Sequence, residues 1–220
     1  MTTPRNPDVT RTRIVKAAFQ EMYLRGFQGM RVDEVLERTG LKKGALYHHF
    51  PSKLALGYAV LDEVISDMIL GLWVRPLEGR DDPVEAMAQL LDTVSSRITS
   101  EQVSLGCPLN NLAQEMSPVD EGFRNRVKRV FAAWEAGLTR CFETGQRTGL
   151  VRRDIDLAAS ATFIVGAIEG CSGIAKTNKS AADFRNCADQ LKLYLEGLRR
   201  PVDQVPYSPA RMENAFSRVG

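Results

Sequence analysis

A short basic segment near the N-terminus carries the side chains best suited to chemistry, and that chemistry is contact with nucleic acid. Lysine can donate hydrogen bonds to guanine edges or phosphate, and tyrosine and histidine can donate to phosphate oxygens. Lys42 and Lys43 stand where a helix is expected to begin, and Lys53 stands at the next helix start. Cations are disfavoured there because the helix dipole is already positive. Such cations suit phosphate binding; a solvated basic surface is the alternative.

The elements that must position this segment form a predicted helix-turn-helix. Two short helices are expected over residues 32–39 and 43–49, and Gly40 between them suits a left-handed helix end. Leu36, Gly40 and Leu46 stand at the offsets that a tight turn with a small shared core requires. A preceding helix completes this three-helix head through an apolar stripe of Ile14, Ala17, Ala18 and Met22.

The charge distribution indicates a polyanionic partner for the head alone. The whole chain of 220 residues has a formal net charge of only +2. Residues 1–53 hold ten Lys and Arg against five Asp and Glu, and the remainder holds nineteen against twenty-two, so +5 and −3 give the total. A basic head on a mildly acidic body is typical of a protein that binds nucleic acid through one domain.

The same composition argues against several other function classes. The two histidines, His48 and His49, are adjacent, and there is no glycine-rich phosphate loop or metal-spaced cluster, so we expect no enzyme activity, metal or cofactor. The four cysteines lie far apart without a C-x-x-C pair, which suits a reducing cytoplasm better than a disulfide scaffold. The N-terminus lacks a secretory pattern and charges interrupt every apolar run, so we expect a cytoplasmic protein with no membrane partner.

Helical periodicity continues to near the C-terminus, so the predicted fold class is all-α with about nine helices. Beyond the head, helices are expected over residues 52–73, 83–100, 108–116, 118–148, 157–176 and 180–198. Ser52, Asp82 and Asp156 are the predicted N-caps of three of them, and Gly149 is expected to end the helix that begins at 118. The predicted domains are a DNA-binding domain at 1–53, a helical C-terminal domain at 54–198, to which the family resemblance described next assigns effector binding and dimerisation, and a weakly ordered, proline-containing tail at 199–220.

One sequence string resembles a known family. Lys43-Gly-Ala-Leu-Tyr-His-His-Phe, followed by Ser52-Lys53, resembles the N-terminal domain of TetR-family regulators, and the resemblance covers about residues 10–60. It implies a homodimer that reads a palindromic DNA operator through its two third helices. The resemblance places at base edges Lys42, Lys43, Ala45 and His48, and at phosphates Tyr47, His49 and Lys53. Arg31 stands where the family usually has a capping Thr or Ser and is a further candidate for phosphate contact.

By the same resemblance, the C-terminal helices bind a small-molecule effector. Aromatic residues at helical spacing offer apolar walls, and amides and a carboxylate offer polar anchors. An aromatic stripe is more often plain core, so both interpretations stay open. The predicted pocket residues are Cys107, Asn110, Asn111, Gln114, Phe131, Trp134, Phe163 and Glu169.

The family also implies a dimer seam of two helices per subunit. Helix 157–176 is nearly uncharged and contains Gly166, Gly170 and Gly173, and small residues allow close helix–helix approach. An ordinary protein core is the alternative. The predicted interface residues are Leu157, Ala161, Ile164, Ile168, Cys171, Leu191, Tyr194, Leu195 and Leu198.

Cys107 carries a sharper hypothesis. Pro108 is favoured at the first position of a helix, so Cys107 is predicted at the N-cap, where the dipole and free N–H groups favour a thiolate. A reactive thiol beside the pocket would sense electrophiles or oxidants, whereas an inert buried cysteine is the alternative. Cys141, Cys171 and Cys187 are expected to be packing residues.

Together these features predict a DNA-binding transcriptional regulator. The simplest mechanism is a repressor released from its operator by a small molecule or a thiol-reactive compound. The alternative is a helical interaction protein with a vestigial DNA-binding head, and a salt-dependent DNA affinity would separate the two.

Overall fold

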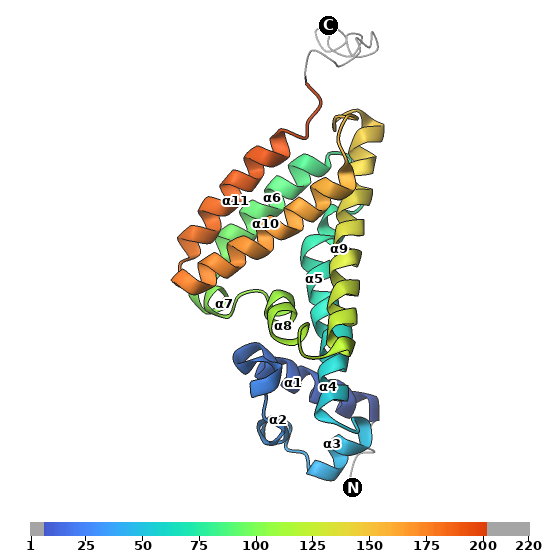
Figure 1. Cartoon of the computed structure of the whole chain (residues 1–220), viewed down its shortest axis with the longest axis vertical. Coiled ribbons are helices and arrows are strands. Elements are labelled where there is room, and N and C mark those ends of the chain that lie inside the picture. Colours follow the sequence, from blue (N-terminus) through green and yellow to red (C-terminus); the bar gives the residue numbers. More distant parts are fainter. Residues whose placement is uncertain (1–6, 202–220) are drawn as a thin grey trace, which may run out of the picture.

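The computed structural model describes residues 7–201, and this part of the chain is almost entirely helical (Figure 1). Within it the β structure is limited to an isolated bridge between Val151 and Arg199. The predicted all-α fold class is confirmed. The elements are α1 Pro7–Gly29, α2 Val32–Thr39, α3 Lys43–His49, α4 Lys53–Ala59, the π-helical segment η1 Val60–Ile65, α5 Ser66–Trp73, the 3-10 turn η2 Arg75–Leu77, α6 Pro83–Arg97, α7 Ser100–Leu105, α8 Pro108–Met116, α9 Glu121–Thr148, α10 Leu157–Asn178 and α11 Ala181–Glu196.

Helices α1 to α3 form the head at one end of the molecule (Figure 1). α1 kinks at Gly26, whose φ of 74° is readily adopted by glycine. α2 ends at Gly40 in the left-handed conformation, as predicted. Ile14, Val35 and Leu46, one from each helix, are fully buried and form the small core that the turn requires. This core fixes which side of α3 faces outward.

A long helical rod leads from the head into the body. Ser52 caps α4 by accepting a hydrogen bond from the backbone N–H of Ala55, as predicted, and α4, η1 and α5 follow one another directly. The rod runs beside α9 (Figure 1). The Tyr58 hydroxyl joins the two by donating to Oδ1 of Asp120, the N-cap of α9, at 2.7 Å. The rod therefore gives the head a fixed attachment to the body.

The body is built from α6, α9, α10 and α11, with α8 between it and the head (Figure 1). α10 packs against both α9 and α11, and α11 packs against α6. The predicted caps are present: Asp82 accepts from the N–H of Glu85, and Asp156 accepts from the N–H groups of Ala158 and Ala159. The caps explain why α6 and α10 begin where the sequence places them.

One helix was missed. The sequence predicts a helix to about residue 100 and then a loop, but α6 ends at Arg97 and α7 follows. α7 begins with a capping box, in which Thr99 accepts from the N–H of Gln102 and the Gln102 side chain accepts from the N–H of Thr99.

The first residues of the predicted tail are held in place. The Arg199 guanidinium pairs with Asp82 at 2.7 Å, and the N–H of Arg200 donates to the carbonyl of Leu150 at 2.9 Å. The expectation of weak order is therefore wrong for these two residues. The rest of that tail, residues 202–220, lies outside the described residues.

Two expectations about the sequence of α10 are wrong. The first is that charges interrupt every apolar run: α10 is long and apolar enough to cross a membrane by length and composition alone, with Glu169 and Lys176 as the charges in its sequence. Its buried residues pack against α9 and α11. Cys171 of α10 and Cys187 of α11, expected to be packing residues only, form a disulfide with a Cα–Cα distance of 5.9 Å. Spacing along the chain gave no sign of this pair because two antiparallel helices bring it together.

Candidate DNA-binding surface and cavity

The outer face of α3 brings the predicted base-edge residues together. Lys42, Lys43 and His48 are exposed, and Ala45 beside them is half-buried. On the opposite side Leu46 is fully buried in the head. α3 therefore presents a basic face with a small residue at its centre, which suits close approach to a DNA groove.

Two of the predicted phosphate residues share this face. Tyr47 is 39% exposed, and Nζ of Lys43 lies 6.0 Å from the centre of its ring. His49 is half-buried, with its ring centre 5.5 Å from that of His48. Both side chains can donate to phosphate oxygens at the edge of α3.

The other two predicted phosphate residues already have protein partners. Arg31 forms a surface ion pair with Glu34 at 3.5 Å. Lys53 donates from Nζ to the carbonyl of Gln28 at 2.9 Å and lies 5.1 Å from the centre of the Phe27 ring. In this conformation Lys53 joins the start of α4 to the end of α1.

A mainly apolar cavity of about 340 Å³ lies in the body. Its volume falls in the range of small-molecule sites. Its walls come from α5, α6, α7, α10 and α11, from the start of α8, and from one residue of α1. The apolar lining includes Met68, Ile69, Leu72, Trp73, Leu90, Val94, Val103, Ile168 and Phe184, and the polar lining includes Tyr23, Thr93, Arg97, Gln102, Cys107, Glu169 and Ser172.

Cys107 and Glu169 form the polar centre of this cavity. Cys107 is the N-cap of α8, as predicted, and its thiol donates to Oε1 of Glu169 at 3.1 Å. Burial raises the pKa of the Glu169 carboxyl to about 7. Burial, followed by the charge of Glu169, raises the pKa of the Cys107 thiol well above its usual value. The predicted thiolate is therefore wrong, because desolvation outweighs the helix N–H groups.

Helix α8 connects this cavity with the head. The Tyr23 hydroxyl, from α1, donates to the carbonyl of Gly106 at 2.7 Å, directly before the start of α8. In the last turn of α8, the Glu115 carboxylate accepts from the N–H groups of Phe27 at 2.9 Å and Gln28 at 2.8 Å. These N–H groups follow the kink in α1. α8 therefore contacts the cavity at one end and the head at the other.

Two separate parts of the chain, one in the head and one in the body, match known protein families. Residues 14–60 match the family described as bacterial regulatory proteins, tetR family. Residues 83–190 match the C-terminal domain described as transcriptional regulator LmrA/YxaF-like. The chain belongs to the TetR family. It is a DNA-binding transcriptional regulator and not an enzyme, as predicted.

Individual relatives agree with this assignment. The HTH-type transcriptional repressor DhaR of Mycobacterium sp. (strain GP1) is 26% identical over 194 residues, or 88% of this chain and 87% of that protein. The uncharacterised HTH-type transcriptional regulator YxaF of Bacillus subtilis (strain 168) is 25% identical over 83% of this chain and 93% of its own length. A crystal structure of a TetR transcriptional regulator from Chloroflexus aurantiacus has a TM-score of 0.77 at 25% identity, covering 89% of this chain and 98% of that one.

The cavity of this TetR-family chain coincides only partly with the predicted pocket. Cys107 and Glu169 line it. Trp134 is fully buried and stacks on Trp73 with ring centres 5.8 Å apart, so Trp73 is the tryptophan that reaches the cavity. The aromatic residues of α9 are core because the cavity opens between α5, α6 and α10. The predicted residues outside its lining are Asn110, Asn111, Gln114, Phe131, Trp134 and Phe163.

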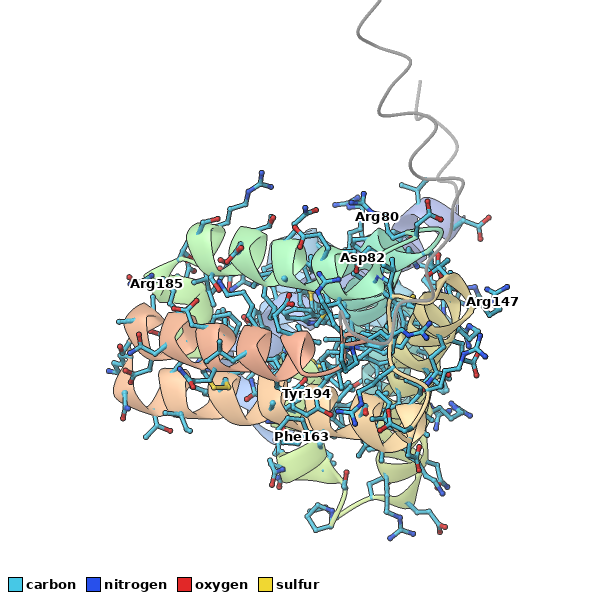
Figure 2. The ribbon with its side chains drawn as sticks, turned by 90° about the horizontal axis from the view of Figure 1, so that it is seen from above. Arg80, Asp82, Arg147, Phe163, Arg185 and Tyr194 are labelled. Carbon is cyan, nitrogen blue, oxygen red and sulfur yellow. A yellow bond between two sulfur atoms is a disulfide. The ribbon has the colours of Figure 1, made fainter. Side chains whose placement is uncertain are left out.

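Most of the predicted dimer residues are core of a single protomer. Each has at most 8% of its surface exposed, which leaves little of it for a partner to contact: Leu157, Ala161, Ile164, Ile168, Cys171, Leu191, Leu195 and Leu198. The small-residue pattern did not reveal which side of α10 faces outward. Tyr194 is half-buried, and its ring centre lies 4.5 Å from that of Phe163 (Figure 2).

The outward side of these two helices is apolar. Phe163, Ile174 and Leu193 are 52%, 58% and 66% exposed. Beside them, a Cβ added to Gly166 or Gly170 would meet nothing within 4 Å, so these glycines also face open space. We call this surface the α10–α11 face; it consists of Phe163, Gly166, Gly170, Ile174, Leu193 and Tyr194.

The sequence did not single out Tyr23 and Trp73, which line the cavity, or Glu115, which connects α8 with the head. Tyr23 and Trp73 continue apolar helical stripes and carry no local sign of a cavity. The N–H of Phe27 and the carboxylate of Glu115 are 88 positions apart, so no local motif could reveal their contact.

Proposed function

We propose that this chain is a cytoplasmic transcriptional repressor that leaves a palindromic operator when a small molecule occupies the cavity. The observation that carries the proposal is the course of α8, which starts at the cavity and ends on the head. A ligand acts on DNA binding only if it favours one arrangement of the head over another. A shift at Cys107 would be transmitted through one rigid helix to the carboxylate that holds the end of α1.

On the operator, α3 of each protomer would enter the major groove, with the two helices about 34–36 Å apart on the DNA. The exposed basic face supports this assignment. The base-edge residues would be Lys42, Lys43, Ala45 and His48, and the phosphate residues Arg31, Tyr47, His49 and Lys53. For Lys53, phosphate contact would replace or share its bond to Gln28.

The environment of Cys107 favours a non-covalent effector over an electrophile or oxidant. The thiolate is the nucleophile, and this thiol has a raised pKa and a carboxylate as its neighbour. We therefore expect the Cys107→Ser variant to keep its response to the effector, because serine can still donate to Glu169.

The homodimer would form through the α10–α11 face. Exposed apolar side chains beside outward glycines allow two copies of α10 to approach closely. A palindrome-reading head requires such a partner, since one protomer supplies one α3.

The test is a titration of the DNA upstream of the protein's own gene at several salt concentrations. Lys43→Ala should weaken binding and lower the slope of log affinity against log salt by about 1 if Lys43 reaches a phosphate, or relax base preference if it reaches a base edge. Lys128→Ala, an exposed lysine of α9, is the matched control and should change neither. Absence of salt-dependent specific binding would favour the interaction-protein alternative.

A second pair of variants tests the role of α8. Glu115→Ala should weaken operator binding by about fivefold, because loss of two hydrogen bonds worth roughly 1 kcal/mol together frees the head to adopt other orientations. Gln114→Ala, the exposed neighbour, should leave the affinity unchanged. Equal affinities for the two variants would remove α8 from the proposed route.

A further inference from the structure

At the wall of the cavity, a single oxygen of the Glu169 carboxyl has a hydrogen-bond partner among the described residues. Its Oε1 accepts the hydrogen bond from Cys107, whereas its buried Oε2 has no hydrogen-bond partner among the described residues. The whole residue is only 7% exposed and belongs to the cavity lining. A buried oxygen without a donor is destabilising by about 1–3 kcal/mol, so this atom is an acceptor prepared for a donor that the protein does not supply.

The neighbouring polar groups do not donate a hydrogen bond to Oε2 of Glu169. The Tyr23 hydroxyl donates to Gly106, and the Cys107 thiol already serves Oε1. Arg97 lines the cavity but is an exposed side chain, and within residues 7–201 no ion pair joins it to Glu169. The negative charge of Glu169 is therefore not balanced by a cation of the cavity wall.

The rest of the lining determines what else the ligand must be. Trp73 and Ile69 of α5 and Phe184 of α11 belong to the apolar wall of the cavity. Such a wall accepts hydrocarbon or aromatic groups and rejects a second charge, because an unpaired charge is expensive to bury. The raised pKa of Glu169, about 7, has the same origin: burial penalises its anion.

We propose that the cavity binds a mainly apolar molecule carrying one protonated amine, and that this amine donates to Oε2 of Glu169. The inference rests on the proposed function for the role of the cavity and adds the chemical class of the effector. A cation is favoured over a neutral hydroxyl because it both donates the missing hydrogen bond and neutralises the buried anion.

A matched series of small probes tests this class: 4-phenylbutylamine, 4-phenylbutan-1-ol and 4-phenylbutanoate. They share one apolar skeleton and differ in the terminal group. Trp73 lines the cavity and stacks on Trp134, and these are the two tryptophans of the chain, so tryptophan fluorescence reports occupancy directly. At about pH 8 the amine is protonated and Glu169 is mostly ionised.

The wild-type protein should bind the amine at least about tenfold more tightly than the alcohol, and the acid most weakly. Glu169→Gln keeps the size and the acceptor but removes the charge, so the preference for the amine should disappear. Ser172→Ala, on the same helix and also in the lining, is the control and should keep the preference. Equal binding of amine and alcohol, no binding of the amine at about 1 mM, or an amine preference retained in Glu169→Gln would each overturn the proposal.

A parallel DNA titration separates this inference from the proposed function. Amine binding that depends on Glu169 and also weakens operator binding supports both. Amine binding that depends on Glu169 but leaves operator binding unchanged supports the ligand class and contradicts the regulatory role of the cavity. If a different ligand releases the operator and the cavity shows no preference for the amine, the result contradicts the proposed ligand class and leaves the regulatory role of the cavity standing.

Discussion

At the scale of single residues, the buried carboxyl of Glu169 links the stability of this regulator to pH. An ordinary glutamate has a pKa of 4.5, whereas burial raises that of Glu169 to about 7. Between these values the folded protein keeps a proton that the unfolded chain has released. The contribution of this residue therefore favours folding fully below about pH 4.5, declines as pH rises, and is lost above about pH 7.

The Glu169→Gln variant should remove this dependence. At about pH 8 it should be more stable than the wild type by up to about 3 kcal/mol, and near pH 4.5 the two should be equal, because the neutral acid resembles the amide. Urea unfolding of both proteins at the two pH values measures the difference. If the free energy of unfolding changed with pH in the same way for both proteins, burial would not be destabilising the ionised Glu169.

Sequence-based prediction succeeded at this scale where a residue acts on its near neighbours. Ser52, Asp82 and Asp156 cap helices through N–H groups two or three positions away, so the motif contains both partners. Glu115 and Glu169 depend on residues brought near by the fold. Cys107 was placed correctly at its helix start, but its depth of burial, which determines its chemistry, is a property of the whole structure.

At the scale of elements, the disulfide between Cys171 and Cys187 joins α10 to α11. Within the described residues, Cys107 and Cys141 are free thiols. The disulfide spans a sequence separation of 16 and closes the turn between two antiparallel helices. Since the same helices line the cavity and form the α10–α11 face, their pairing affects both.

Reduction of this disulfide should lower the free energy of unfolding by about 3 kcal/mol, the value expected from the chain entropy of a loop of this length. Thermal or urea unfolding with and without dithiothreitol measures it. Cys187→Ser serves as the control, because its stability should not respond to the reductant. A wild type that is equally insensitive would indicate that the pair contributes no stabilisation.

Helix prediction from the sequence was accurate wherever caps and breakers agree with periodicity. The start of α6 at Asp82 and Pro83 and the end of α9 at Gly149 are examples. α7 was lost because it is short, and its capping box lies inside a segment that continued the preceding helical pattern. The sequence therefore identified every α-helix of the described residues except α7, but it did not show which side of each helix is exposed.

At the scale of the whole molecule, the dimer interface proposed for the α10–α11 face would determine whether two heads can act together. Leu193, at 66% exposed, is the most exposed of its large apolar residues. Exposed apolar patches on soluble proteins mark interaction surfaces, and two α3 helices on one palindrome require a fixed pairing of protomers.

Leu193→Glu should convert the dimer to a monomer and reduce operator affinity, because it places two like charges within the seam. Val119→Glu, at a residue 63% exposed on the loop before α9, is the matched control and should remain dimeric. Sedimentation equilibrium gives the association state of both. A Leu193→Glu protein that remains dimeric would move the interface to another surface.

The π-helical turn η1, residues Val60–Ile65, lies in the rod that leads from α3 to the body. A π turn holds one residue more than an α turn, so it absorbs an extra residue within the rod. Loss of one residue from a regular α-helix would turn one half of the rod by about 100° about its axis, whereas loss of one residue from this turn would restore α geometry with little rotation. Because paired α3 helices must enter grooves in phase with the DNA double helix, this turn is a place where evolution can change the length of the chain by one residue and keep the direction of the head.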